Sequence, residues 1–208
     1  IIDNTQTGLQ YSDRIDVMGT GTINIDDHQQ LQLTTQYYKS ESDGKHGLFL
    51  GENFAAVTGD AKAYNKDNLN SDRIPGTERH LINLQYSNTD FWGQDLVAQI
   101  YYRDESLTYY PFPTLSKGAV TSIGASQQKT DFYGGKLTLN SKPMDDLTLT
   151  WGVDADHETF DANQQFFDLS KAAASGGMEL DNAYNVGRYP GYSITNLAPF
   201  LQASYDID

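Results

Sequence analysis

The chain has 208 residues, and its 28 Asp and Glu against 14 Lys and Arg give a formal net charge of −14. Nucleic acid is excluded as an expected partner, because binding to a phosphate backbone calls for basic patches. The chain has no cysteine and so can form neither disulfides nor thiolate metal sites. It also lacks a run of about 18 apolar residues, which excludes a transmembrane helix but leaves transmembrane strands possible.

Seven segments alternate apolar and polar residues with a period of two, the pattern typical of β-strands. The clearest is 147–156, where the apolar residues Leu147, Leu149, Trp151, Val153 and Ala155 are interleaved with polar residues and one glycine. We predict an all-β fold, an antiparallel meander of about seven strands. The predicted strands span 12–26, 29–41, 77–88, 93–105, 128–141, 146–158 and 193–207.

Short and long connections alternate between these predicted strands. The short ones lie around Asp26–Gln29, Ser87–Trp92 and Ser141–Asp146, and the long polar ones are Ser42–Asp72, Asp104–Gln127 and Asp161–Tyr189. A meander of this kind has its tight turns at one edge and its long loops at the other. That asymmetry is typical of outer-membrane barrels. Periodicity alone does not separate a barrel from a water-soluble β-sandwich, whose strands alternate as well.

The positions of the aromatic residues favour the barrel. A membrane barrel carries aromatic belts at both bilayer interfaces, and many aromatic residues here lie near the ends of predicted strands. They are Tyr11, Tyr37, Tyr102 and Tyr133 at the long-loop edge, and Tyr86, Trp92 and Tyr205 at the tight-turn edge. The apolar residues also form stripes on single faces, with few positions that look buried on both sides.

The chain begins Ile1-Ile2-Asp3, without an initiator methionine or a signal peptide, and it ends in a predicted strand. We therefore expect a segment of a longer protein. Seven is an odd number of strands, whereas bacterial single-chain barrels use even numbers and must close to satisfy every backbone group in lipid. Residues 1–208 are predicted to form a portion of one transmembrane barrel domain, which alone would not make a pore.

Several segments resemble TonB-dependent ferric siderophore receptors. They are 3–14 (DNTQTGLQYSDR), 69–80 (LNSDRIPGTERH), 101–106 (YYRDES), 110–114, 136–144, 154–157, 187–190 and 194–197. The resemblance implies a 22-stranded barrel in the outer membrane of a Gram-negative bacterium, an N-terminal plug inside it, and energy supplied through TonB. Neither a plug segment nor a TonB-contacting box is found in the 208 residues, so the transport machinery is implied by the resemblance alone.

A receptor for a compact anionic chelate, such as a ferric citrate-hydroxamate siderophore, needs cations for the carboxylates and aromatic surfaces for the apolar body. Two prolines, Pro111 and Pro113, would stiffen an aromatic cluster in one predicted loop. The candidate ligand-binding residues are Arg73, Arg103, Tyr109, Tyr110, Phe112, Phe166, Phe167, Arg188 and Tyr189. The alternative is that these arginines pair with nearby Asp residues or lipopolysaccharide phosphates while the aromatic residues only pack the loops.

No motif indicates an enzyme or a resident cofactor. Asp154, Asp156 and His157 are better explained by a water-facing barrel wall than by a metal site, and the four histidines show no helical i, i+4 pair. The expected partners are a ferric siderophore as the transported ligand, the TonB complex through the plug, and outer-membrane lipid and lipopolysaccharide. A passive porin-like or adhesion barrel and a soluble β-sandwich that binds ligand through its loops remain alternatives.

Overall fold

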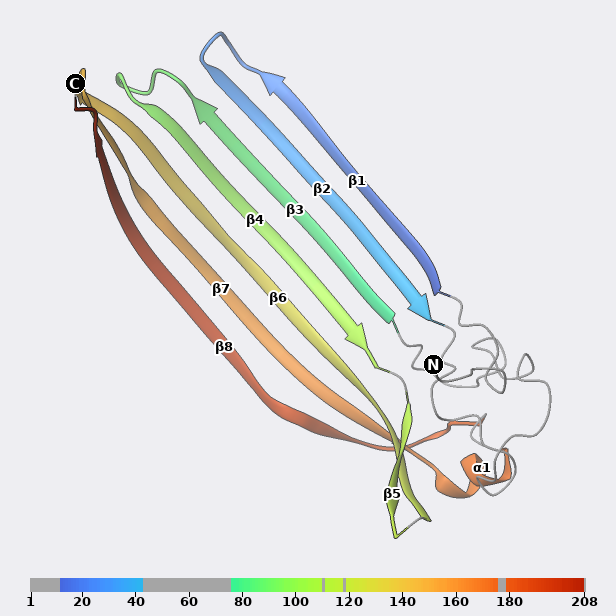
Figure 1. The fold of residues 1–208 in the computed structure, drawn as a ribbon. Helices are drawn as coiled ribbons and strands as arrows, with labels where there is room; N and C mark the ends of the chain where they lie inside the picture. Colours follow the sequence, from blue (N-terminus) through green and yellow to red (C-terminus); the bar gives the residue numbers. More distant parts are fainter. Residues whose placement is uncertain (1–11, 43–75, 110, 118, 176–178, 208) are drawn as a thin grey trace.

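The structure is a computed structural model that describes residues 12–42, 76–109, 111–117, 119–175 and 179–207. These residues form one antiparallel sheet in the order β1-β2-β3-β4-β6-β7-β8, with β5 paired to β6 (Figure 1). The strands are β1 (Ser12–Asn24), β2 (Gln29–Ser42), β3 (Gly76–Asn88), β4 (Asp95–Thr108), β5 (Phe112–Ser116), β6 (Ala119–Met144), β7 (Leu147–Phe167) and β8 (Asn182–Tyr205). One short helix, α1 (Leu169–Ala174), lies between β7 and β8. The predicted all-β antiparallel fold is confirmed.

The register between strands places residues of one kind in rows across the sheet. One row runs through Leu31, Tyr86, Ala98, Leu137 and Val153 on five successive strands. Because side chains alternate between the two faces of a strand, the residues that lie one position away form a row on the opposite side. We call the two sides the apolar face and the polar face of the sheet.

The polar face is held together by hydrogen bonds between side chains of neighbouring strands. Its matching row runs through Gln32, Gln85, Gln99, Lys136 and Asp154. Gln99 donates to Asn83 at 2.8 Å, and Lys136 forms an ion pair with Asp154 at 3.3 Å. The polar side chains of this wall therefore satisfy one another across the strands.

The apolar face carries large side chains that the described part of the chain does not cover. Val17 and Ile100 are each 62% exposed, and Leu197 is 73% exposed. A contiguous exposed apolar surface is unusual for a soluble monomer and marks a surface that contacts lipid or a partner. Among the described residues no helix is long and apolar enough to cross a bilayer.

The three tight turns, at 25–28, 89–94 and 145–146, lie at one edge of the sheet, as predicted, and the connections that contain β5 and α1 lie at the other (Figure 1). In the first turn the Asp26 carboxylate accepts hydrogen bonds from the backbone N–H groups of His28 at 2.9 Å and Gln29 at 2.8 Å. The Gln29 side chain donates to the same carboxylate at 2.5 Å. Asp26 thus closes this turn with its own side chain.

Two of the three predicted long loops are wrong, because strands run through most of their length. Strand β4 continues to Thr108, β6 begins at Ala119, β7 continues to Phe167 and β8 begins at Asn182, and β5 was not predicted. The antiparallel ladder needs only backbone groups, so polar residues can extend it without any apolar period. Gln127 illustrates this, since it is the register partner of Thr108 although both residues are polar. Its side-chain amide adds hydrogen bonds to Ser106 at 3.2 Å and Thr108 at 3.3 Å. The third segment, 42–72, lies almost wholly outside the described residues.

The longer strands also change where the predicted aromatic belt lies. Tyr37, Tyr102 and Tyr133 are inside β2, β4 and β6, not at their ends. Tyr86, Trp92 and Tyr205 do lie at the tight-turn edge, and Tyr11 is outside the described residues. The prediction was wrong for the first group. For Tyr102 and Tyr133 the reason is that β4 continues to Thr108 and β6 already begins at Ala119, whereas Tyr37 lies well inside a strand whose end was predicted to within one residue.

The extended ends of β6 and β7 pack with α1 into a small core. Its buried residues are Ile123, Ala125, Phe167, Ala172 and Leu180, each at most 3% exposed. In Figure 1 this part lies beyond the end of β4, beside the β5 hairpin. At this edge of the sheet, the ends of β6 and β7 and helix α1 therefore pack together around buried side chains.

Two glycines in the sheet should respond differently to substitution by alanine. A Cβ atom on Gly152 would overlap the Leu137 carbonyl oxygen and lie 2.8 Å from Cζ of Phe200, whereas one on Gly21 would have no neighbour within 4 Å. Gly152→Ala should lower the free energy of unfolding by about 1–3 kcal/mol through overpacking. Gly21→Ala should be neutral or slightly stabilising. Urea unfolding of the refolded full-length protein measures both, and equal effects would contradict the observed packing.

The Asp26 turn should weaken in acid. Hydrogen bonds from the backbone N–H of His28, and then from Gln29, hold the pKa of Asp26 below its ordinary value of 3.8. A carboxylate with a lowered pKa contributes stability that is complete above the unfolded-state pKa and is lost as the pH falls through the folded-state value. Asp26→Ala should therefore be less stable than the wild type near neutral pH, and the difference should shrink below about pH 4.

Asp27→Ala is the matched control, because the Asp27 side chain has no hydrogen bond within the described part of the turn. The measurement is the unfolding midpoint of the three proteins at several pH values. A difference between Asp26→Ala and the wild type that persists unchanged in acid would refute this role for the carboxylate.

Candidate functional site

Arg103 lies on the polar face of β4, five positions before the end of the strand. It is the register partner of Phe132, and its guanidinium carbon lies 5.3 Å from the centroid of the Phe132 ring. Among the described residues no carboxylate is within ion-pair distance of Arg103. It was predicted to lie near the end of a strand over 93–105, just below a loop, and the structure places it farther from the strand end because β4 continues to Thr108.

A hollow of about 260 Å³ opens beside Arg103. It is lined by Thr34, Leu81, Asn83, Gln99, Tyr101, Tyr102, Arg103 and Phe132. The lining combines aromatic rings, amide groups and a guanidinium. Such a lining suits a small anionic group attached to an apolar body.

Arg188, near the start of β8, joins two other predicted residues. Its guanidinium carbon lies 5.8 Å from the ring centroid of Tyr109 and 5.3 Å from that of Tyr189. It donates a hydrogen bond to Oγ of Ser126, a residue only 2% exposed. Like Arg103, it has no carboxylate partner among the described residues. Tyr109 is thus brought together with the adjacent pair Arg188 and Tyr189, far from it in sequence, and the three candidates form one cationic aromatic cluster.

The remaining candidates do not join this cluster in the described structure. Phe166 stacks on Tyr184, with ring centroids 5.0 Å apart. Phe167 is 3% exposed and belongs to the small core, because residues that follow one another in a strand point to opposite sides. We therefore leave Phe167 out of the binding surface. Arg73 and Tyr110 lie outside the described residues, as does the side chain of Phe112.

The other two described arginines are neutralised by acids. Arg14 pairs with Asp16 at 3.2 Å, and Arg79 pairs with Glu105 at 3.6 Å. Both guanidinium groups also lie over the ring of Tyr38, at 5.0 Å and 5.3 Å from its centroid. Sequence reasoning missed this group, although a register prediction could have found it, since Tyr38 and Glu105 are the direct strand partners of Arg79.

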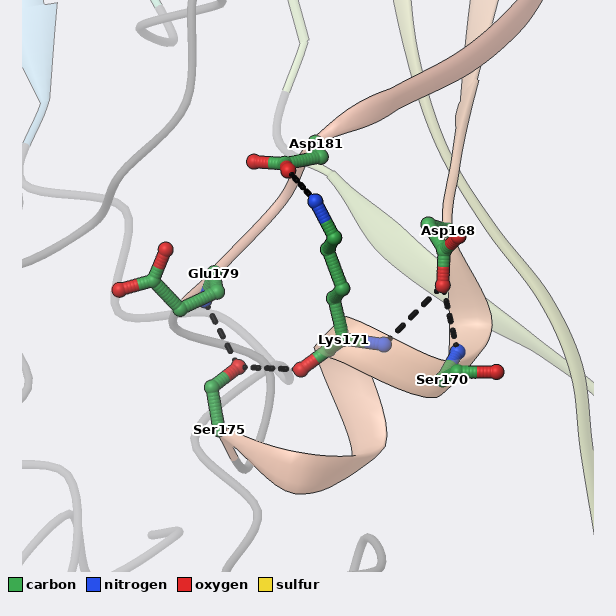
Figure 2. A network of polar contacts seen from close by, with 6 residues as sticks. All are labelled: Asp168, Ser170, Lys171, Ser175, Glu179 and Asp181. Atoms are coloured by element: carbon green, nitrogen blue, oxygen red, sulfur yellow. Dashed lines mark hydrogen bonds and ion pairs between the residues drawn. The ribbon is translucent and has the colours of Figure 1, made fainter.

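The segment that leads into β8 is fixed by a network of polar contacts (Figure 2). The Asp168 carboxylate caps α1 and accepts from the backbone N–H groups of Ser170 at 2.9 Å and Lys171 at 3.0 Å. Lys171 pairs with Asp181, whose carboxylate raises the pKa of the Lys171 amine. Oγ of Ser175 donates to the Lys171 carbonyl at 2.9 Å and accepts from N–H of Glu179 at 2.8 Å. This network anchors the start of the strand that carries Arg188.

Asp154 and Asp156 lie on the polar face of β7 and take part in contacts across the strands, whereas His157, predicted to lie on the same water-facing wall, is on the opposite, apolar face. Asp154 pairs with Lys136, Asp156 accepts from Asn196 at 2.8 Å, and His157 is within 2.8 Å of Thr195 and 3.0 Å of Ser193. Across the described ranges no three His, Asp or Glu side chains lie together in a way that could hold a metal ion.

Comparison with curated proteins shows close relatives over the whole chain. The chain is 63% identical to the ferric aerobactin receptor of Klebsiella pneumoniae and 62% identical to that of Escherichia coli, over 100% of its own length and 28% and 29% of theirs. The rhizobactin receptor of Rhizobium meliloti (strain 1021) is 35% identical over 99% of the chain and 28% of that protein. The chain is homologous to a segment of siderophore receptors.

The predicted resemblance to ferric siderophore receptors is thereby confirmed. These relatives are named as receptors, in agreement with the prediction that the chain is not an enzyme. The chain spans 28–29% of the length of the relatives that it matches. No family model and no solved structure matches the chain.

Substitution of two adjacent phenylalanines by alanine should have different effects on stability, because only one of the two rings packs in the core. Phe167→Ala removes a buried ring and should lower the stability of the extended end by about 3 kcal/mol or more. Phe166→Ala removes a ring that is stacked on Tyr184 and is not part of the core, so its cost should be much smaller. Hydrogen exchange at the Ala172 amide, which donates to the Asp168 carbonyl, measures the local opening. Similar exchange in both variants would contradict the placement of Phe167 in the core.

Proposed function

We propose that the chain is part of the barrel wall of an outer-membrane, TonB-dependent receptor that takes up ferric aerobactin. The observation that carries the proposal is that two arginines have no acidic partner among the described residues. In a chain with a net charge of −14, Arg103 and Arg188 lie against aromatic rings and have no carboxylate partner among the described residues. An arginine that stays unneutralised amid so many acids suits an anionic ligand.

The identity to the relatives supports the choice of ligand. The chain is 62–63% identical to two ferric aerobactin receptors but 35% identical to the rhizobactin receptor. Both comparisons cover nearly the whole chain, so the difference does not come from a different region. Ferric aerobactin is therefore the first ligand to test.

The two faces of the sheet support a placement in the membrane. The apolar face would lie against lipid and the polar face would line the lumen, since a barrel exposes one side of each strand to lipid. The edge with the tight turns would be periplasmic, and the edge with β5 and α1 would be extracellular, close to lipopolysaccharide. The described sheet would continue into further strands of a 22-stranded barrel, and the plug that contacts TonB would come from other parts of the receptor.

The polar face offers two kinds of contact to a ferric chelate. Arg103 and Arg188 can donate paired N–H groups to carboxylates, an arrangement that fits the planar guanidinium. Tyr109 and Tyr189 offer ring surfaces to the apolar parts of the chelate. Binding is non-covalent, and transport would follow from movement of the plug.

Equilibrium binding to the full-length protein in detergent tests the ligand directly. Ferric aerobactin should bind, and a ferric tris-catecholate should bind far more weakly. Binding of neither chelate would refute the receptor proposal and favour a passive barrel. Preferential binding of the catecholate would keep the receptor class but refute the ligand.

The two arginines should contribute to the affinity for ferric aerobactin but not to the stability of the barrel. Replacing both Arg103 and Arg188 with Ala should weaken ferric aerobactin binding by about tenfold or more, since hydrogen bonds to charged groups contribute about 1.5–3 kcal/mol each. Arg14→Ala is the control, because Arg14 is already paired with Asp16. Unchanged affinity in the double variant, with the barrel folded as judged by its thermal unfolding, would refute the assignment of the site.

A further inference from the structure

Arg103 and Arg79, on neighbouring strands, each lie over an aromatic ring, but among the described residues only Arg79 also pairs with an acid. Glu105 lies 3.6 Å from the Arg79 guanidinium and cancels its charge. Phe132 lies under Arg103 with a centroid distance of 5.3 Å and leaves the charge in place. A ring orients a guanidinium through its quadrupole without neutralising it. The wall thus fixes one arginine while keeping it available to a ligand anion.

The Phe132 ring is itself held by a second ring. Tyr101, two positions before Arg103 on the same face of β4, stacks on Phe132 with centroids 5.4 Å apart and an interplanar angle of 22°. The strand partner of Tyr101 is Gly134. A Cβ atom on Gly134 would lie only 2.6 Å from the Tyr101 hydroxyl oxygen and 2.8 Å from its Cζ. The absence of a side chain at Gly134 therefore lets the Tyr101 ring lie flat beside Phe132.

The hollow next to this stack provides amide groups. Gln99 donates to the Asn83 oxygen at 2.8 Å, which leaves the Asn83 amide nitrogen able to donate to a bound group. At about 260 Å³ the hollow lies below the usual range of whole small-molecule sites, which is about 300–1,000 Å³. It fits one arm of a chelate better than the whole chelate.

We propose that this hollow is a subsite for a free carboxylate of the ferric chelate, with Arg103 as the binding residue and Phe132, Tyr101 and Gly134 as positioning residues. The subsite selects carboxylate-bearing ferric chelates over neutral ones. This inference rests on the proposed receptor function and adds to it the part of the ligand that the wall recognises.

The test compares two chelates on the full-length protein in detergent. Ferric aerobactin has carboxylate groups from its citrate unit. A ferric trihydroxamate is neutral, because the charges of three hydroxamates balance Fe³⁺. Phe132→Leu should weaken ferric aerobactin binding by about threefold or more, because Arg103 loses its ring. Phe132→Tyr keeps a ring and should bind within about twofold of the wild type. Any weak binding of the neutral chelate should be the same in all three proteins.

Each outcome separates the subsite from the receptor function. If the wild type binds neither chelate, the proposed function fails. If the wild type binds ferric aerobactin and Phe132→Leu binds it equally well, the subsite is refuted while the receptor function stands. Equal losses in Phe132→Leu and Phe132→Tyr would also refute it, because the ring would not be the cause. If Phe132→Leu does not fold, Tyr101→Leu replaces it, with a loss for ferric aerobactin alone as the expected result.

Discussion

The antiparallel register, combined with the period of two along each strand, is the constraint on which everything else in this structure depends. It sorts side chains into an apolar face and a polar face across seven neighbouring strands. A slip of one residue in β4 would carry Arg103 to the apolar face and Ile100 to the polar one. The tight turns resist such a slip, and the Asp26 carboxylate shows how one turn is closed by its own side chain.

The register also decides which arginines are neutralised. Arg79 faces Glu105 directly across two strands, whereas Arg103 faces Phe132. The two arginines are of the same type and lie on neighbouring strands, yet one becomes part of the wall and the other stays available. Charge composition alone would not show this difference, because the chain as a whole carries an excess of acids. The function follows from which residue stands opposite, not from how many arginines the chain has.

Much of the fold was predictable from the sequence, because the middle of each strand alternates clearly. The face of Arg103 followed from its parity with Gln99 and Tyr101, and the positions of the tight turns followed from the short polar gaps. The strand ends near α1 were not predictable from periodicity. Polar residues such as Gln127 and Asn163 form the ladder there, and backbone hydrogen bonds leave no apolar pattern.

The sequence allowed us to predict several residues of the candidate site, but not which of them lie together in the structure. Arg188, Tyr109 and Tyr189 were named as separate candidates, and their meeting depends on the bulges between β7 and β8. Phe167 was taken for a binding residue because the sequence does not show which of two adjacent rings enters the core. The Tyr101 and Phe132 stack was missed because it depends on the glycine directly across the strand pair.

The most direct test of the central claim is to locate the iron of bound ferric aerobactin by anomalous diffraction from crystals of the full-length protein. We predict that the iron lies on the polar side of the sheet, with chelate oxygens hydrogen-bonded to Arg103 or Arg188. An iron site at which the chelate touches neither arginine would contradict the claim that these unneutralised cations recognise the ligand.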